Sequence, residues 1–205
     1  MASTQKTLSV ATPDADLLEW LLDDIGADRS SASPVARFSD HELVFELPTE
    51  SGEPGGLDKA DVLVGLVRFV DLLTLQQMEE LLRPASTRGP LAVAILIYRN
   101  EGEEDFKMSC PYCGQKLWVR DVDVDKRGRC PHCRKGFTLP KQEEHVRAIL
   151  KLPASVPVHR VQRNDAGSIS SPLRRIRSLK KESVLDHLGI HFQASNQTMN
   201  VDVEE

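Results

Sequence analysis

Cysteine is the residue type with the clearest chemical potential in this chain of 205 residues. The sequence holds two Cys-x-x-Cys pairs, Cys110 with Cys113 and Cys130 with Cys133, separated by sixteen residues. Each pair can offer two sulfur atoms from one tight turn, and a hairpin between the pairs would bring the two turns together. Four thiolates at this spacing match a tetrahedral Zn²⁺ site. We therefore predict one structural zinc ion, bound within a ribbon over residues 106–140.

The predicted site is closed. All four sulfur atoms would be ligands, so no coordination position remains open for water, and catalytic zinc is not expected. A ribbon of about thirty residues cannot bury enough surface to fold alone. Binding of zinc, worth roughly 10–16 kcal/mol in such sites, would supply the folding free energy. His132 lies inside the second pair and is expected to be an exposed turn residue.

The two cysteine pairs have a second interpretation. CPYC and CPHC also occur as active-site sequences of glutaredoxin-like and disulfide-oxidising proteins of the thioredoxin fold. Those sites place the first cysteine at the N-terminus of a helix, whose dipole stabilises the thiolate. Here Gly114 and a strand-like segment at 117–124 follow the first pair. We therefore favour a metal site over redox catalysis.

The segment CPYCGQKLWVRDVDVDKRGRCPHCRKGFTLP resembles a short zinc ribbon common in bacterial proteins. That family reads CPxCG, a short strand, an acidic middle, GRCPxC and an aromatic strand that ends near proline. Besides the cysteines, the match includes Pro111, Gly114, Gly128, Pro131 and Phe137. The family is structural and is appended to many unrelated proteins, so the resemblance implies metal binding and no reaction. Gly114 is expected to take the positive φ that closes the first turn.

Charge is distributed unevenly along the chain, whose net charge is −5. Residues 1–109 carry 9 basic and 20 acidic groups, residues 110–181 carry 17 and 6, and residues 182–205 carry 0 and 5. Such asymmetry can mark a nucleic-acid or partner surface. Cations can also offset the formal charge of zinc with four thiolates. The candidate phosphate contacts are Lys126, Arg127, Arg129, Arg134, Lys135, Arg174, Arg175 and Arg177.

The ribbon also holds three aromatic residues. Tyr112, Trp118 and Phe137 are expected to fill its small core.

The elements before the ribbon are predicted to be mostly helical. Residues 1–56 read as a flexible lead with one helix, capped by Asp14 or Asp16, and a short strand at 41–47. Residues 57–105 read as a helical module, because apolar residues recur there at helical spacing. Residues 91–98 are apolar on every side, and we favour a buried helix over a buried strand.

Residues 57–99 resemble the helical-hairpin repeat in the N-terminal domains of type II secretion and type IV pilus ATPases. The positions that match are Leu63, Leu66, Val67, Leu72, Leu73, Thr74, Gln77, Met78 and Leu82. Some members of that family bind a cyclic dinucleotide through an Arg-Leu-Gly start, which this sequence lacks. The resemblance implies a small helical module and does not favour cyclic-dinucleotide binding.

The elements after the ribbon are predicted to be few. Residues 141–152 read as a short helix, and residues 153–205 as a basic linker followed by an acidic tail, both largely disordered. The predicted fold class is therefore α+β: a small, mostly α-helical N-terminal module and a β-hairpin zinc ribbon, with disordered linkers and tail.

The function predicted from these features is non-enzymatic. The six histidines are scattered, and no Ser/His/Asp order or phosphate loop stands out. The start of the chain does not read as a signal peptide, and no apolar stretch is long enough for a membrane helix, so we expect a cytoplasmic protein. We predict an adaptor whose zinc ribbon docks a protein partner. The alternative is a nucleic-acid-binding or transcription-associated protein that uses the ribbon and residues 160–181.

Overall fold

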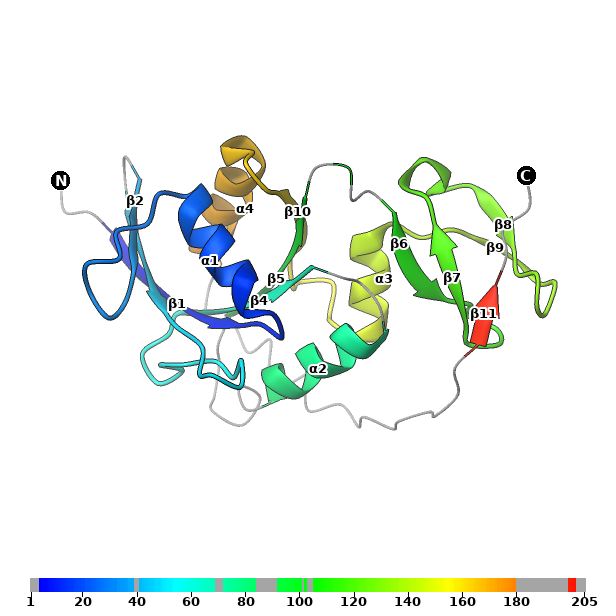
Figure 1. The fold of residues 1–205 in the computed structure, drawn as a ribbon, viewed down its shortest axis with the longest axis horizontal. Coiled ribbons are helices and arrows are strands. Elements are labelled where there is room, and N and C mark those ends of the chain that lie inside the picture. The colour runs from blue at the N-terminus through cyan, green and yellow to red at the C-terminus, as the bar shows by residue number, and fades with distance from the viewer. Residues whose placement is uncertain are drawn as a thin grey trace.

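The centre of the fold is a six-stranded sheet of order β10-β5-β4-β1-β3-β2 (Figure 1). It is seen in a computed structural model that describes residues 4–38, 41–68, 72–83, 92–100, 102, 105–179 and 199–201. The strands are parallel except for β2, which pairs antiparallel with β3. Their bounds are β1 Thr4–Ala11, β2 Val35–Arg37, β3 His41–Glu46, β4 Val62–Val67, β5 Ala92–Arg99 and β10 Val158–Gln162.

Helices cover both faces of this sheet. Helices α1 (Ala15–Asp24) and α4 (Ala166–Ser178) pack on one face, and α2 (Leu72–Leu82) and α3 (Gln142–Ile149) on the other (Figure 1). Every residue of β4 and β5 is buried, as expected for parallel strands that are covered on both sides. The order of the five parallel strands, with β1 between β4 and β3, is that of a flavodoxin-like, doubly wound α/β sheet, and β2 adds an antiparallel edge strand.

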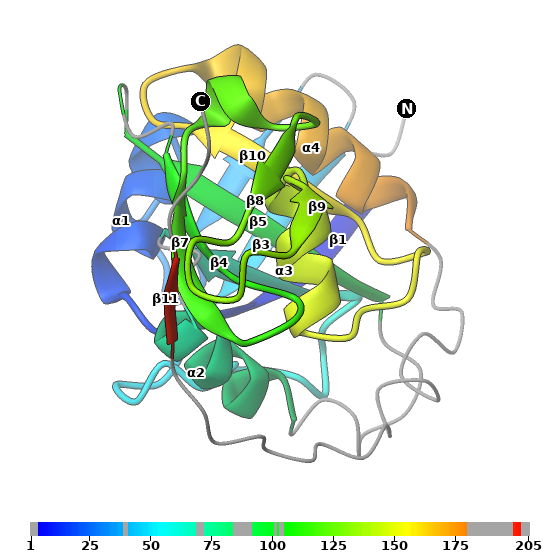
Figure 2. The same cartoon turned by 90° about the vertical axis from the view of Figure 1, so that its right-hand side faces the viewer.

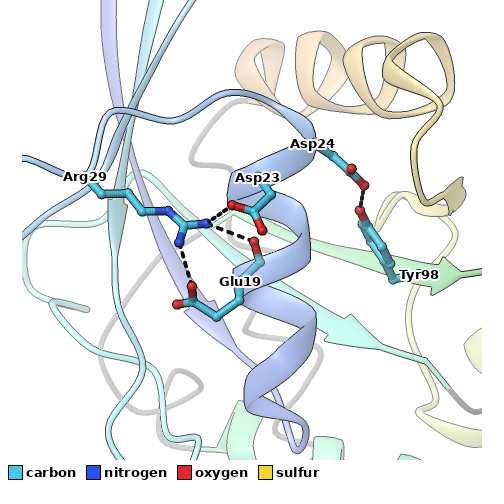
Figure 3. A network of polar contacts seen from close by, with 5 residues as sticks. All are labelled: Glu19, Asp23, Asp24, Arg29 and Tyr98. Atoms are coloured by element: carbon cyan, nitrogen blue, oxygen red, sulfur yellow. Dashed lines mark hydrogen bonds and ion pairs between the residues drawn. The ribbon is translucent and has the colours of Figure 1, made fainter.

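Helix α1 is capped at its N-terminus and bonded to the sheet at its C-terminus. The side chain of Asp14 accepts a hydrogen bond from the backbone of Asp16 at 3.1 Å and caps the helix, as predicted. At the other end, the buried hydroxyl of Tyr98 on β5 donates a hydrogen bond to Asp24 (Figure 3). Burial, followed by this hydrogen bond, raises the pKa of Tyr98. Tyr98 therefore links α1 to the central sheet in its neutral form.

The ribbon is inserted between β5 and β10. It consists of two short antiparallel pairs, a 3₁₀ turn η2 and a core of its own. A third strand from the C-terminal part of the chain, β11, joins the first pair. The bounds are β6 Phe106–Ser109, β7 Gln115–Val119, η2 Asp121–Asp123, β8 Arg127–Arg129, β9 Gly136–Thr138 and β11 Met199–Val201.

The predicted fold class is wrong. The structure is an α/β protein with a large parallel sheet, and of the described residues in 57–99 only α2 is an α-helix. The segments Val62–Val67 and Ala92–Arg99, predicted to be helical, are strands. A short apolar run has no period that separates a buried strand from a buried helix. The β-branched valine and isoleucine residues in both runs favour the strand. The helical-hairpin repeat is thus not the fold of this segment.

The predictions of disorder are also wrong where the structure describes those residues. Strand β1 occupies part of the expected flexible lead, and β10 and α4 occupy much of the expected basic linker. In α4, Ile169, Leu173 and Ile176 are buried against the sheet. The serine and proline residues of this segment favoured a linker in the sequence analysis, although its apolar residues recur at helical spacing. The helix α3 and the strand β3 agree with the prediction.

The predicted domain boundaries stay a prediction. Much of the acidic tail lies outside the described residues. None of the helices in the described part of the chain is both long and apolar enough to cross a membrane.

Candidate metal centre

The structure brings the four cysteines together. Their sulfur atoms all lie within 4.8 Å of one another. The Sγ atoms of Cys110 and Cys133 are 3.8 Å apart, and those of Cys113 and Cys130 are 3.5 Å apart. Tetrahedral zinc with Zn–S bonds of about 2.3 Å requires sulfur atoms separated by about 3.8 Å. The four thiols are free, so the cluster can bind a metal ion with all four sulfurs.

The two turns that carry the cysteines have the same backbone hydrogen bonds. In the first turn, the Gly114 amide donates to the Cys110 carbonyl at 2.9 Å. In the second, the Arg134 amide donates to the Cys130 carbonyl at 2.6 Å. Gly114 has the predicted positive φ, 73°, and Arg134 has a φ of 60° at the equivalent position. The two Cys-x-x-Cys pairs therefore form matching turns, each of which presents two sulfur atoms.

The thiols differ in their surroundings. Cys110 and Cys130 are buried in the ribbon core, whereas Cys113 and Cys133 are partly exposed. Burial raises the pKa of Cys110. Burial acts in the same direction on Cys130, but the backbone N–H of Cys133, 3.2 Å from its sulfur, and the neighbouring thiols outweigh it and lower its pKa to about 6. The hydrogen bond from Cys133 thus favours the thiolate form, which a metal requires, at Cys130.

Two of the three aromatic residues lie outside the ribbon core, contrary to the prediction. Tyr112 and Trp118 are 54% and 56% exposed, and only Phe137 packs against the core. In β7 the residues alternate, so Leu117 and Val119 point inward and Trp118 outward. The Trp118 indole donates a hydrogen bond to Asp105 at 3.2 Å. The core is filled instead by aliphatic residues and Phe106.

The predicted basic residues lie on two different parts of the molecule. Arg127 and Arg129 are exposed on β8, and Arg134 and Lys135 on the second cysteine turn, where Lys135 lies over the Tyr112 ring at 5.1 Å. Lys126 forms an ion pair with Asp123 at 2.9 Å. Arg174 and Arg175 are exposed on α4, which packs on the sheet, and the side chain of Arg177 is outside the described residues. The basic residues of the ribbon and of α4 thus do not form one cluster within a single module.

An arginine that the sequence did not single out holds the ribbon against the sheet. The Nη1 atom of Arg160, on β10, is 2.6 Å from Asp121 of the ribbon, and its Nε atom is 2.9 Å from Glu143 of α3. The ring of Phe106 also lies 6.2 Å from that of His145 on α3. Arg160 and Asp121 are 39 residues apart in sequence. No local pattern could have predicted this contact.

Comparisons with known proteins leave the family open. No family model matches this chain. No curated protein matches it either. Among solved structures, it is similar to a crystal structure of an SsGBP mutation variant at 11% sequence identity, with a TM-score of 0.47. The match covers 85% of this chain and 57% of that chain, so this protein spans little more than half of its length.

The sheet itself offers a second concave site. In doubly wound sheets, ligands bind beyond the carboxyl ends of the strands, where the strand order reverses. A pocket of about 390 Å³ lies there, between the ends of β1 and β4, and Asp14, Asp16 and Arg68 are among the residues that line it. Asp14 caps α1, and the Arg68 guanidinium lies 5.0 Å from the centre of the Trp20 ring. Asp14 and Arg68 thus have structural contacts of their own, and the cysteine cluster is the better-supported site.

Proposed function

We propose that this protein is a zinc-binding, non-enzymatic adaptor, whose ribbon is a rigid docking platform for a protein partner. The observation that carries the proposal is the exposure of large apolar side chains on the ribbon. Of the four large apolar side chains that are exposed in the described residues, Tyr112, Trp118 and Val122 belong to the ribbon, and Leu47 to the sheet domain. Exposed aromatic residues are typical of the energetic centres of protein interfaces.

The donor set supports one structural zinc ion. Four thiolates are soft ligands, which favour zinc over hard cations such as magnesium or calcium. With all four sulfurs bound to the metal, no position is left for a substrate or a reactive water. The metal would then stabilise the two cysteine turns and hold Tyr112, which lies within the first turn, in a fixed position.

The attachment of the ribbon to the sheet supports a docking role. Arg160 contacts both η2 and α3, and Phe106 packs near His145. A surface that is already ordered loses little conformational freedom when a partner binds. The ribbon can therefore present Trp118 and Tyr112 without rearrangement.

Capture of partners from extracts of the source cell tests the adaptor. We would compare the zinc-loaded chain with a Tyr112→Ala/Trp118→Ala variant and with the control variant Leu47→Ala, after nuclease treatment. We expect the same proteins to bind the original chain and the control, and to be lost from the double variant. Equal recovery with all three proteins would refute docking through the ribbon.

Nucleic-acid binding is the second candidate, favoured by the exposed side chains of Arg127, Arg129 and Arg134 on the same module as Tyr112. Cations that track a backbone and an aromatic ring that stacks on bases are the components of many single-strand-binding surfaces. We would measure binding of single-stranded oligonucleotides at several salt concentrations. This function requires affinity that falls steeply with salt and is lost in Arg127→Ala/Arg129→Ala, whereas Arg174→Ala/Arg175→Ala on α4 leaves it unchanged.

A further inference from the structure

The outer edge of β7 is occupied by the chain's own C-terminal segment. Strand β6 pairs with one edge of β7, and β11 pairs in parallel with the other (Figures 1 and 2). The register places Met199 opposite Gln115, Asn200 opposite Lys116 and Val201 opposite Leu117. The apolar residues of β11 thus stand at the positions of buried residues in β7.

This cover is small. Strand β11 has three residues, whereas β7 has five. An edge strand presents unpaired backbone N–H and C=O groups, on which another extended chain can add. Parallel pairing is slightly less stable per residue than antiparallel pairing. A short parallel strand is therefore a cover that a longer strand can replace.

The net charge of the ribbon favours an acidic partner strand. Residues 106–139 hold eight basic and three acidic residues, while residues 182–205 hold five acidic and no basic ones. Each acidic residue of the ribbon is in an ion pair: Asp121 with Arg160, Asp123 with Arg120 and Lys126, and Asp125 with Lys141. The remaining charge of the ribbon is positive and attracts an acidic segment.

The sequence of the C-terminal segment has the pattern of a strand. From position 199 it reads MNVDVEE, in which apolar and polar residues alternate and the later polar residues are acidic. The segment therefore combines acidic charge with the alternating pattern of a strand, and its residues Met199–Val201 pair with β7.

We propose that the outer edge of β7 is a strand-addition site for an extended peptide with alternating apolar and acidic residues, and that Met199–Val201 occupies this site as an intramolecular competitor. Backbone hydrogen bonds along β7 supply affinity in this mode of recognition, and alternate side chains supply specificity. The inference rests on the proposed adaptor function and specifies the chemistry of its partner.

Competition with β11 sets the concentration that a free peptide must reach in order to bind β7. Nineteen residues separate Leu179, the last described residue after α4, from Met199. A tethered segment of this kind acts at an effective concentration on the order of millimolar. A free peptide with the same intrinsic affinity must reach that concentration to displace it. Removal of the tethered strand should strengthen binding of a free peptide by one plus the ratio of the effective concentration to the intrinsic Kd, which is about tenfold for a Kd on the order of 0.1 mM.

A proline variant of the full, zinc-loaded chain tests the proposal. Met199→Pro/Val201→Pro removes two backbone N–H groups of β11, and Ser195→Pro is the control in the same tail. Hydrogen exchange of residues 115–119 reports the cover, and a labelled peptide of residues 197–205 is the probe. We expect faster exchange and about tenfold tighter peptide binding in the double variant only. The same peptide with both prolines should not bind.

Several outcomes would overturn the proposal. Exchange at 115–119 that is the same in all three proteins would show that the tail does not cover β7, and absence of peptide binding to the double variant would show that the edge accepts no partner strand. Protection that depends on protein concentration would assign the covering strand to a second copy. Peptide binding to the double variant, with no partner that depends on Tyr112 and Trp118, would instead refute the adaptor and leave the edge site standing.

Discussion

At the scale of single residues, the two cysteine turns differ at one position of their shared backbone. Gly114 and Arg134 both have positive φ, and only glycine adopts this region at no steric cost. For another L-residue the left-handed conformation costs roughly 1–2 kcal/mol. The second turn therefore carries strain that the first turn does not.

Replacing Arg134 with glycine should relieve this strain. Glycine gains freedom in the unfolded chain, which offsets part of the benefit, so we expect Arg134→Gly to stabilise the protein by about 0.5–1 kcal/mol. Gly114→Ala should destabilise it by a similar amount. Thermal unfolding at a fixed concentration of free zinc measures both changes. A loss of stability in Arg134→Gly would show that its side chain contributes more than its backbone costs.

Burial of His145 makes stability depend on pH. Desolvation lowers the pKa of this histidine from 6.5 to about 4. The unfolded chain then binds the proton more tightly than the folded chain. The free energy of unfolding is therefore not reduced by this histidine above pH 6.5, and it falls as the pH drops towards 4. The loss should approach about 3 kcal/mol at pH 4.

A His145→Leu variant isolates this effect. Denaturant unfolding of both proteins between pH 7 and 4 gives the difference in their free energies of unfolding. Protonation of the cysteines affects the two proteins alike and cancels in the difference. As the pH falls below the pKa of the free imidazole, we expect the free energy of unfolding of the original chain to fall relative to that of the variant. A difference that does not change with pH would contradict the burial of His145.

At the scale of elements, Arg160 is the main polar link between the ribbon and the sheet. Its guanidinium contacts carboxylates of η2 and α3, two elements that are far apart in sequence. Loss of the cation would leave Asp121 and Glu143 near each other without a counter-charge. One Glu143 oxygen is buried without a hydrogen-bond partner, so this carboxylate depends on the contact of its other oxygen with Arg160.

Substitution of Arg160 should loosen this junction. We expect Arg160→Leu to lower the free energy of unfolding by about 1–2 kcal/mol, after allowance for the partial exposure of the ion pairs. Arg160→Lys should keep the charge but lose the geometry that contacts two carboxylates at once, so its free energy of unfolding should lie between those of the original chain and Arg160→Leu. Arg37, which forms two ion pairs on the open surface, is a matched control, and Arg37→Leu should have little effect. An equal loss of free energy of unfolding in Arg160→Leu and Arg37→Leu would show that Arg160 does not link the ribbon to the sheet.

At the scale of the whole molecule, the ribbon and the sheet have separate cores. The apolar clusters on the two faces of the sheet contain no ribbon residue, and the ribbon cluster contains no residue of the sheet. The sheet should therefore keep its fold when a metal ion bound by the four cysteines is removed.

Removal of the metal tests this independence. We expect a strong chelator to abolish protection from hydrogen exchange in residues 106–139 and to leave β1, β4 and β5 protected, because each unit buries its own apolar surface. Elemental analysis before chelation should find about one zinc per chain. Cooperative loss of protection in both units would show that the metal stabilises the whole fold.

The sequence by itself determined the two cysteine turns of the candidate metal site. The two Cys-x-x-Cys pairs and Gly114 specify tight turns, which depend on neighbouring residues only. The cap of α1, predicted at Asp14 or Asp16, and the short helix α3 are local in the same way.

Only the tertiary structure decided the sheet, the exposed surface of the ribbon and its attachment. Val62–Val67 and Ala92–Arg99 are strands because other strands flank them and helices cover both faces, which short apolar runs cannot indicate. Trp118 is exposed because β7 turns its alternate residues outward, and Arg160 meets Asp121 through folding of the intervening chain. These properties depend on contacts between residues far apart in sequence, whereas the conformation of each cysteine turn depends only on its own few residues.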